Sequence, residues 1–223
     1  MLALAATFGL SSCSDDEFTD TKVTHYVSFD LTEGENYALP VGSTYKDPGY
    51  KAMEGTEDVT AHVKVDGTVD GSTVGYYPIT YSAVNKEGYS ASITRNVFVY
   101  NPAVTTDISG TYTTQAGTQR DYGGKKTAFS GQTIVLKEVA PGIFSVSDFF
   151  GGYYDQRAGY GSAYAMTGYV AINADNTLTA LYGHVSGWGD SYNSFSGSYD
   201  PATKTVKLTV AYAGVMTFDI ILN

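Results

Sequence analysis

The chain has 223 residues, 43% of them hydrophobic, a content typical of a folded protein rather than a disordered one. Its formal net charge of -10, with no long basic run, argues against binding to nucleic acid or to anionic lipid surfaces. Val, Thr and Tyr are abundant and there are 25 glycines, which predicts strands joined by tight turns and an all-β fold.

Residues 1–13 have the features of an export signal. Residues 2–10 are uncharged and apolar, too few to cross a bilayer but as long as a signal-peptide core, although no Lys or Arg precedes them. The following Leu10-Ser11-Ser12-Cys13 resembles the bacterial lipobox, which implies a diacylglycerol anchor on Cys13. The alternative is a buried N-terminal element with Cys13 as an inert core thiol.

Residues 14–23 open with the acidic run Asp15-Asp16-Glu17, and acidic runs of this kind are typical of flexible tethers. An acidic segment directly behind the lipidated cysteine also resembles the lipoprotein export signal of Bacteroidota. This resemblance implies a lipid-anchored protein of the outer membrane that faces the cell exterior. A lipoprotein that faces the periplasm is the alternative.

A first domain is predicted over residues 24–100, because short alternating segments are separated by Gly, Pro, Asn and Asp. Strands are expected at 27–29, 37–40, 62–65, 78–83 and 94–99. The segments 40–49 and 75–85 resemble the bacterial Ig-like domain also found in pesticidal crystal proteins. The resemblance implies an Ig-like β-sandwich that serves as a spacer or an adhesive module.

Residues 101–106 contain Pro102 and form the predicted linker to a second domain over 107–223. Eight strands are expected there, at 110–115, 133–139, 143–148, 163–172, 178–185, 194–199, 206–213 and 216–222. Short turns between them favour an antiparallel β-meander, either a barrel or a sandwich. The alternating apolar residues predicted to face its core are Ile134, Leu136, Phe144, Val146, Leu208, Val210, Phe218 and Ile220.

The second domain also resembles the C-terminal domain of small Bacteroidota lipoproteins, a domain of unknown function found alongside glycan-uptake systems. The matching segments are 108–112, 149–154, 187–190 and 195–201. The resemblance implies a cell-surface lipoprotein associated with polysaccharide utilization.

Two loops carry aromatic rings beside polar groups, the chemistry with which proteins bind the apolar faces and hydroxyl rims of sugars. The predicted ligand-binding residues are Phe150, Tyr153, Tyr154, Asp155 and Gln156 in one loop and His184, Trp188, Asp190, Tyr192 and Asn193 in the other. Trp188 is the only tryptophan and the leading candidate. The alternative is that these rings pack in a core or an interface, since the chain has 20 tyrosines.

An enzyme is not expected, because no nucleophile elbow and no nucleotide-binding glycine motif is present. A glycoside hydrolase would require a facing pair among Asp148, Asp155 and Asp190. No metal site and no cofactor is predicted, and Lys125-Lys126 is interpreted as a solvated turn.

These observations predict a non-catalytic surface lipoprotein that binds extracellular glycan as an accessory to an outer-membrane uptake system. The partners expected are therefore glycan, outer-membrane uptake proteins, and the membrane only through the lipid. The alternatives are a structural or adhesion accessory that binds a neighbouring outer-membrane protein and, third, a glycoside hydrolase.

Overall fold

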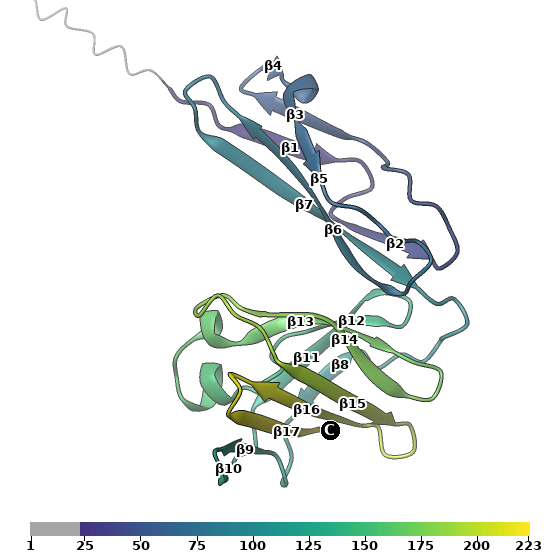
Figure 1. Cartoon of the computed structure of the whole chain (residues 1–223), viewed down its shortest axis with the longest axis vertical. Coiled ribbons are helices and arrows are strands. Elements are labelled where there is room, and N and C mark those ends of the chain that lie inside the picture. The colour runs from purple at the N-terminus through teal and green to yellow at the C-terminus, as the bar shows by residue number, and fades with distance from the viewer. Residues whose placement is uncertain (1–22) are drawn as a thin grey trace, which may run out of the picture.

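The computed structural model describes residues 23–223, which form two units joined after Tyr100 (Figure 1). The predicted signal segment, Cys13 and the acidic segment as far as residue 22 lie outside the described residues. Within 23–223 the regular structure is β-strand apart from three short helical turns, so the predicted all-β fold is confirmed. No helix in this part of the chain has the length and apolar character needed to cross a membrane.

The N-terminal unit is a sandwich of two sheets with the strand orders β1-β3-β4 and β2-β7-β6-β5. β2 runs parallel to β7, and every other pair of neighbours is antiparallel. The elements are β1 (Val27–Leu31), β2 (Asn36–Pro40), β3 (Tyr50–Glu54), β4 (Glu57–Asp58), the 3-10 turn η1 (Thr60–His62), β5 (Lys64–Asp66), β6 (Gly75–Val84) and β7 (Ser90–Tyr100).

Alternation along β6 and β7 builds the core of this sandwich. Ile79 and Tyr81 of β6 and Val97 and Val99 of β7 are buried in this core, and Thr80 between the first two is more exposed. Phe98, between the two valines, is buried on the other face of the sheet, against the C-terminal unit. Two details differ from prediction. The strand expected at 62–65 begins only at Lys64, because residues 60–62 form η1. β3 and the two-residue β4 were missed, because the one buried residue of β3 is the small Ala52 and both residues of β4 are acidic and exposed.

The C-terminal unit is one ten-stranded antiparallel sheet with the order β10-β9-β17-β16-β15-β14-β13-β12-β11-β8. Its elements are β8 (Gly110–Thr113), β9 (Gln119–Tyr122), β10 (Lys125–Ala128), β11 (Thr133–Ala140), β12 (Ile143–Val146), the π-helical turn η2 (Tyr153–Arg157), the 3-10 turn η3 (Ser162–Tyr164), β13 (Met166–Ile172), β14 (Thr177–Val185), β15 (Ser194–Asp200), β16 (Thr205–Tyr212) and β17 (Met216–Leu222).

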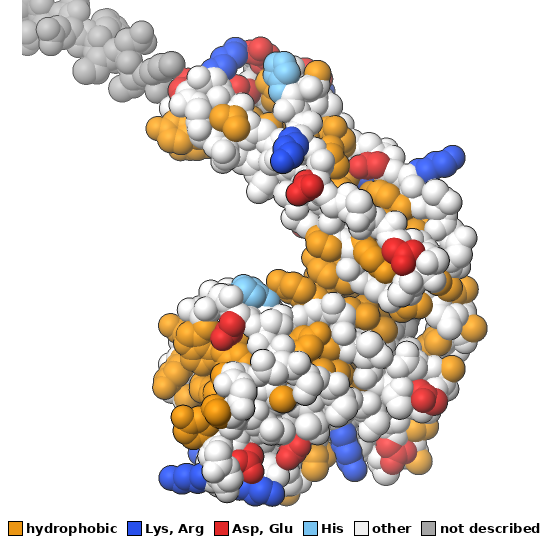
Figure 2. Space-filling model, in the orientation of Figure 1, with side chains coloured by type: hydrophobic (Ala, Val, Ile, Leu, Met, Phe, Trp, Pro, Cys, Tyr) orange, Lys and Arg blue, Asp and Glu red, His pale blue; other side chains and the backbone are white. Residues whose placement is uncertain are grey.

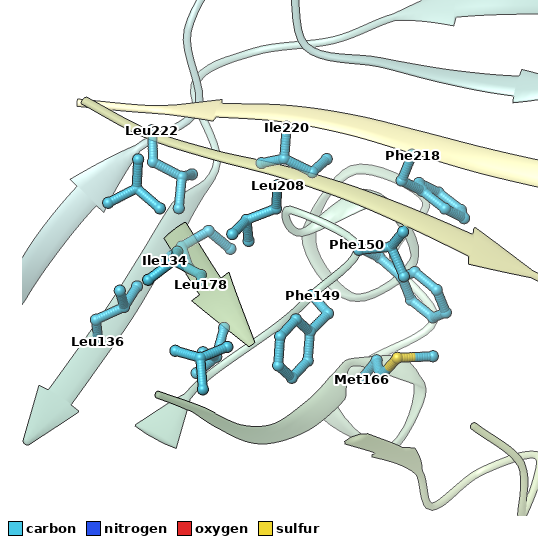
Figure 3. Packing of buried hydrophobic residues seen from close by; sticks show 14 of the residues in the cluster. Ile134, Leu136, Phe149, Phe150, Met166, Leu178, Leu208, Phe218, Ile220 and Leu222 are labelled. Carbon is cyan, nitrogen blue, oxygen red and sulfur yellow. The ribbon is translucent and has the colours of Figure 1, made fainter. Parts of the chain in front are cut away.

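This sheet curls into a half-barrel, which resolves the choice between barrel and sandwich. Beyond β8, Thr114 forms a bridge with Leu222 of β17, and Thr113 exchanges two backbone hydrogen bonds with Asn223. The two sides of the sheet therefore meet at one end. Figure 3 shows the enclosed side chains, with Leu208 and Ile220 facing Ile134 across the interior.

The predicted core set is confirmed, because all eight alternating apolar residues are buried. The strand count was wrong, since ten strands are present rather than eight. β9 and β10 pair as a hairpin through Lys125 opposite Tyr122, in a stretch interpreted from the sequence as a turn. Their side chains are mostly polar because the hairpin lies at the edge of the sheet, so no apolar alternation revealed them.

β14 and β15 separate along most of their length. They pair only through Thr177 with Ser198 and Leu178 with Gly197, whereas β13 and β14 pair along seven positions. The chain between β14 and β15, which contains Trp188, lies at the end where the strands have separated. The same end holds η2, η3 and the tip of the β16–β17 hairpin (Figure 1).

An apolar interface joins the two units. Phe98 of β7 is fully buried against Ile143 of β12 and Ala171 of β13. Tyr169 packs its ring 4.8 Å from both Phe98 and Tyr76, measured between ring centroids. Burial of Tyr76 beside the tyrosines of the C-terminal unit raises its pKa to about 12. The N-terminal unit therefore holds the C-terminal unit in a defined orientation.

We expect Tyr169→Ala to weaken this interface by about 2 kcal/mol, because two aromatic pairs worth roughly 0.5–1.5 kcal/mol each are lost. Differential scanning calorimetry should then separate one unfolding transition into two. Tyr199→Ala, at a half-buried tyrosine packed on the interior of the C-terminal unit, should lower the transition temperature without splitting it. A single transition in both variants would contradict this role of Tyr169.

Candidate functional site

A buried carboxylate organises the first aromatic loop. Asp148 accepts backbone N–H hydrogen bonds from Phe150 at 2.8 Å, Gly152 at 2.9 Å and Met166 at 3.0 Å. Burial raises the pKa of Asp148 to about 7, and these three donors oppose the shift. Both carboxylate oxygens of Asp148 are therefore used in internal hydrogen bonds, which fix the backbone just before η2.

Two glycines with positive φ make the turn before η2 tight. Gly151 and Gly152 have φ of 64° and 76°, in the left-handed region that side chains disfavour. A Cβ on Gly151 would also lie 2.7 Å from the Cδ1 of Ile220. The turn can therefore approach β17 closely, and η2 begins directly after it with Tyr153 and Tyr154.

The rings of this loop lie at different depths. Phe149 and Phe150 have no exposed surface, and Phe150 packs 4.6 Å from Phe218, so it supports the site from beneath. Tyr154 is buried except for one edge and donates its hydroxyl to the Sδ of Met216 at 3.2 Å. Burial raises the pKa of Tyr154, and the nearby Arg120 opposes the shift.

The second aromatic loop is the hairpin that carries Trp188. Gly187 donates its N–H to the carbonyl of Ala163 at 2.7 Å, so the hairpin is attached to η3. A Cβ on Gly187 would lie 2.8 Å from the ring of Tyr164, which explains the glycine at this position. Trp188 follows with 41% of its surface exposed.

Trp188 lies at the centre of a cluster of rings. Its ring centroid is 4.8 Å from that of Tyr154 and 5.0 Å from that of Tyr164, both in edge-on contact, and 6.1 Å from Tyr212. Tyr160, 57% exposed, continues the cluster at 5.6 Å from Tyr164. We call Tyr154, Tyr160, Tyr164, Trp188 and Tyr212 the aromatic face.

Two shallow, open hollows flank Trp188. One, of about 370 Å³, is lined by Tyr160, Tyr164 and Trp188. The other, of about 280 Å³, is lined by Tyr154, Tyr212, Ala213 and Met216 together with the opposite side of Trp188. Figure 2 shows hydrophobic side chains gathered on this side of the C-terminal unit. The indole is therefore a ridge between two surfaces of aromatic character.

Three polar groups at the aromatic face have no partner within residues 23–223. The hydroxyls of Tyr160 and Tyr164 and the indole N–H of Trp188 form no hydrogen bond there. Each can exchange hydrogen bonds with a ligand that lies in the hollows. No group of three or more His, Cys, Asp or Glu side chains suited to a metal ion occurs in the same part of the chain.

Other predicted site residues are engaged in internal hydrogen bonds. Asp190 accepts from the Tyr212 hydroxyl at 2.7 and 2.8 Å, and burial together with this bond raises the pKa of Tyr212. Asn193 accepts from the N–H of Gly214 at 2.8 Å. The amide of Gln156 bonds both the N–H and the carbonyl of Thr133. These three side chains hold the loops in place.

The remaining predicted residues lie elsewhere. His184 has its ring 6.4 Å from that of Tyr182, on the side of β14 that faces the N-terminal unit. Tyr192 packs inward against Phe149 at 6.3 Å. Tyr153 packs edge-on against Phe129, with the ring centroids 5.1 Å apart. Asp155 is half-buried on η2.

Sequence reasoning missed three members of the aromatic face. Tyr160 and Tyr164 belong to the segment between η2 and β13, and Tyr212 ends β16. The spacing Tyr160-Gly161-Ser162-Ala163-Tyr164 offered a signal, because two tyrosines around small residues suit an aromatic surface loop. Tyr212 had none, since it continues the apolar alternation of its strand.

Two family models match the chain. One, described as a bacterial surface protein Ig-like domain, covers residues 29–99, which confirms the predicted resemblance of the N-terminal unit. The other, described as a C-terminal domain, covers residues 101–223. Neither describes an enzyme family.

Among solved structures, the lipoprotein BT2262 from Bacteroides thetaiotaomicron is similar to this chain. The two sequences are 44% identical, and the alignment covers 89% of this chain and 100% of that chain with a TM-score of 0.51. The predicted resemblance to a Bacteroidota lipoprotein is therefore confirmed. A search of curated proteins gives no match.

Proposed function

The chain belongs to the family of the Bacteroides thetaiotaomicron lipoprotein BT2262, and from this premise we propose that it is a non-catalytic glycan-binding protein of the outer membrane. A lipid on Cys13 anchors it, the N-terminal unit acts as a spacer, and the aromatic face binds extracellular glycan. In this role it serves as an accessory to a polysaccharide-uptake system.

The observation that carries this proposal is the exposed Trp188 ridge between two open hollows. Sugar rings bind through apolar faces against aromatic side chains while their hydroxyls exchange hydrogen bonds at the rim. The unpartnered hydroxyls of Tyr160 and Tyr164 and the Trp188 N–H supply those hydrogen bonds. The open shape of the hollows suits an extended chain better than an enclosed small molecule.

Catalysis receives less support than binding. A glycosidase needs two available carboxylates across a sugar bond. Asp148 is buried with both oxygens hydrogen-bonded, and Asp190 is held by Tyr212. Asp155 is the remaining carboxylate of the predicted set.

We expect Trp188→Ala to reduce glycan retention at least about tenfold, since truncation of an aromatic anchor typically removes more than 1.4 kcal/mol of binding free energy. The measurement is a glycan-array screen of the full chain in detergent. Tyr160→Ala tests the same face at a more exposed ring, and Tyr89→Ala, at an exposed tyrosine of the N-terminal unit, is the matched control. The unfolding temperature of each variant reports whether the fold is retained.

A second candidate function is a structural or adhesion accessory that binds a neighbouring outer-membrane protein. It is favoured by the apolar side chains that extend the aromatic face, among them Val215 at 55% exposure. Retention of glycan by the wild type and its loss in Trp188→Ala would support the glycan-binding proposal. No retention on any glycan would reject it in favour of this candidate.

A further inference from the structure

A cluster of cationic side chains borders the aromatic face. Arg120 comes from β9, Lys125 and Lys126 come from β10, and Arg157 ends η2. They are four of the 13 Lys and Arg residues in a chain with a net charge of -10. Figure 2 shows Lys and Arg side chains next to the hydrophobic patch, where β9 and β10 lie in Figure 1. We call these four residues the cationic edge.

The cationic edge has no ion-pair partner in the described part of the chain, where the two ion pairs are Lys86–Glu57 and Arg95–Asp47. The carboxylates on the adjoining strands β9 and β17 are Asp121, which is the cross-strand neighbour of Lys126, and Asp219. Asp121 accepts the N–H of Gly124 at 2.7 Å, and Asp219 accepts from Gln119 and Thr209 at 3.0 Å. The Nε of Arg120 is buried without a hydrogen bond.

Aromatic rings hold the two arginines in position. The Arg120 guanidinium carbon lies 4.7 Å from the ring centroid of Tyr153 and 5.5 Å from that of Tyr122. The Arg157 guanidinium lies 5.0 Å from the same Tyr153 ring. Contacts of this kind restrain a guanidinium without neutralising it, so its charge stays available to a ligand.

The cationic edge continues into the aromatic face. Tyr153 contacts Tyr154 at 5.1 Å, and Tyr154 contacts Trp188. On the adjoining strands, Tyr122 pairs with Met216, which lines the hollow beside Trp188. A ligand that extends from this hollow past Met216 reaches the cationic edge.

We infer that the glycan bound at the aromatic face carries an anionic group, a carboxylate or a sulfate, which Arg120 and Arg157 receive while Trp188 contacts an apolar sugar face. This inference rests on the proposed glycan-binding function. Guanidinium groups bind both anions through charge-assisted hydrogen bonds. The net charge of -10 repels dense polyanions, so the ligand carries isolated acidic groups.

The test compares matched ligands on the full chain in detergent. For the carboxylate, trigalacturonic acid is compared with its methyl ester; for the sulfate, lactose 3′-sulfate is compared with lactose. In at least one of the two pairs, we expect the acidic ligand to bind about tenfold more tightly than its neutral counterpart. A charge-assisted hydrogen bond contributes about 1.5–3 kcal/mol, and about 1.4 kcal/mol corresponds to a tenfold change in affinity. Arg120→Gln/Arg157→Gln should remove this preference and leave the affinity for the neutral member unchanged.

Two further variants complete the test. Lys125→Gln/Lys126→Gln alters exposed side chains of the same edge and should lower the preference without affecting folding. Lys137→Gln/Lys207→Gln makes the same change of charge at exposed positions on β11 and β16 and should retain the preference. Raising the salt to about 1 M, where the Debye length falls to about 3 Å, should weaken the preference.

The outcomes separate this inference from the proposed function. Equal, Trp188-dependent binding of acidic and neutral members would overturn the anionic subsite and leave glycan binding intact. An equal loss of both members in the arginine variant would show a structural role and would also overturn the subsite. Binding of neither member of either pair, with no other glycan retained, would overturn both proposals.

Discussion

Asp148→Ala is expected to destabilise the C-terminal unit by roughly 3–9 kcal/mol, because three buried backbone N–H groups lose their acceptor at about 1–3 kcal/mol each. The donors belong to Phe150, Gly152 and Met166. Loss of these bonds also frees the start of η2, so Tyr154 no longer supports Trp188. Urea denaturation measures the stability and the glycan array measures the binding, and both should fall.

Asp148→Asn tests the charge of the same group. Its pKa is raised to about 7 in the folded protein from 3.8, so between these values the folded state holds a proton that the unfolded state has released. The contribution of Asp148 to stability is therefore complete below about pH 4, declines as the pH rises toward 7, and is constant above that. The decline amounts to at most about 4 kcal/mol at 1.36 kcal/mol per pKa unit.

Asparagine does not titrate, so the difference in unfolding free energy between wild type and Asp148→Asn should fall from pH 4 to pH 7. Urea titrations at several pH values measure this difference. If the difference instead grows with pH, the three N–H donors stabilise the carboxylate more than burial destabilises it, and the raised pKa is wrong.

Asp47→Ala is expected to destabilise the N-terminal unit by about 3–5 kcal/mol, because it leaves the fully buried Arg95 guanidinium without its counter-ion. Arg95 lies 2.6 Å from Asp47 and also donates to the carbonyls of Thr32 and Gly49, so it ties β7 to the chain just after β1 and just before β3. Chemical denaturation followed by tyrosine fluorescence measures the loss.

A double variant separates the ion pair from general packing. Asp47→Ala/Arg95→Met removes both charges, and a buried pair replaced by apolar side chains is often close to neutral. The double variant should therefore be more stable than Asp47→Ala. Equal instability of the two would contradict the assignment of the loss to an unpaired charge.

Acid should weaken the same pair. Burial alone would raise the pKa of Asp47, but hydrogen bonds from Tyr81 and the Gly49 N–H, together with the charge of Arg95, lower it below 3.8. Its stabilisation is thus present above the unfolded value and is lost as the pH falls through the folded one. This dependence is opposite in sign to that of Asp148, so the two units should respond differently to acid.

The aromatic face illustrates why exposure was hard to predict. Phe150 and Trp188 share one sequence pattern, since each is an aromatic residue next to glycine in a loop. Phe150 is enclosed because its turn approaches β17, whereas Trp188 is exposed because its hairpin extends beyond the separated ends of β14 and β15. Neither the approach nor the separation is encoded within the loops themselves.

The sequence by itself determined the all-β fold, the resemblance of both units to their families and the buried alternating set from Ile134 to Ile220. These depend on periodicity and turn residues, which act over a few positions, so a local pattern suffices to identify them. Trp188 was proposed as a site residue for a similar reason, since a lone tryptophan between glycines is a local feature.

Only the tertiary structure decided which rings join Trp188 and which cations lie beside them. Tyr160, Tyr164 and Tyr212 meet it because sheet curvature brings η2, η3 and the tips of two hairpins to one end, while His184 is directed to the opposite surface of the sheet. Arg120 and Arg157 are 37 positions apart and share one tyrosine ring. Such contacts depend on the closure of the whole sheet, which no short segment of sequence specifies.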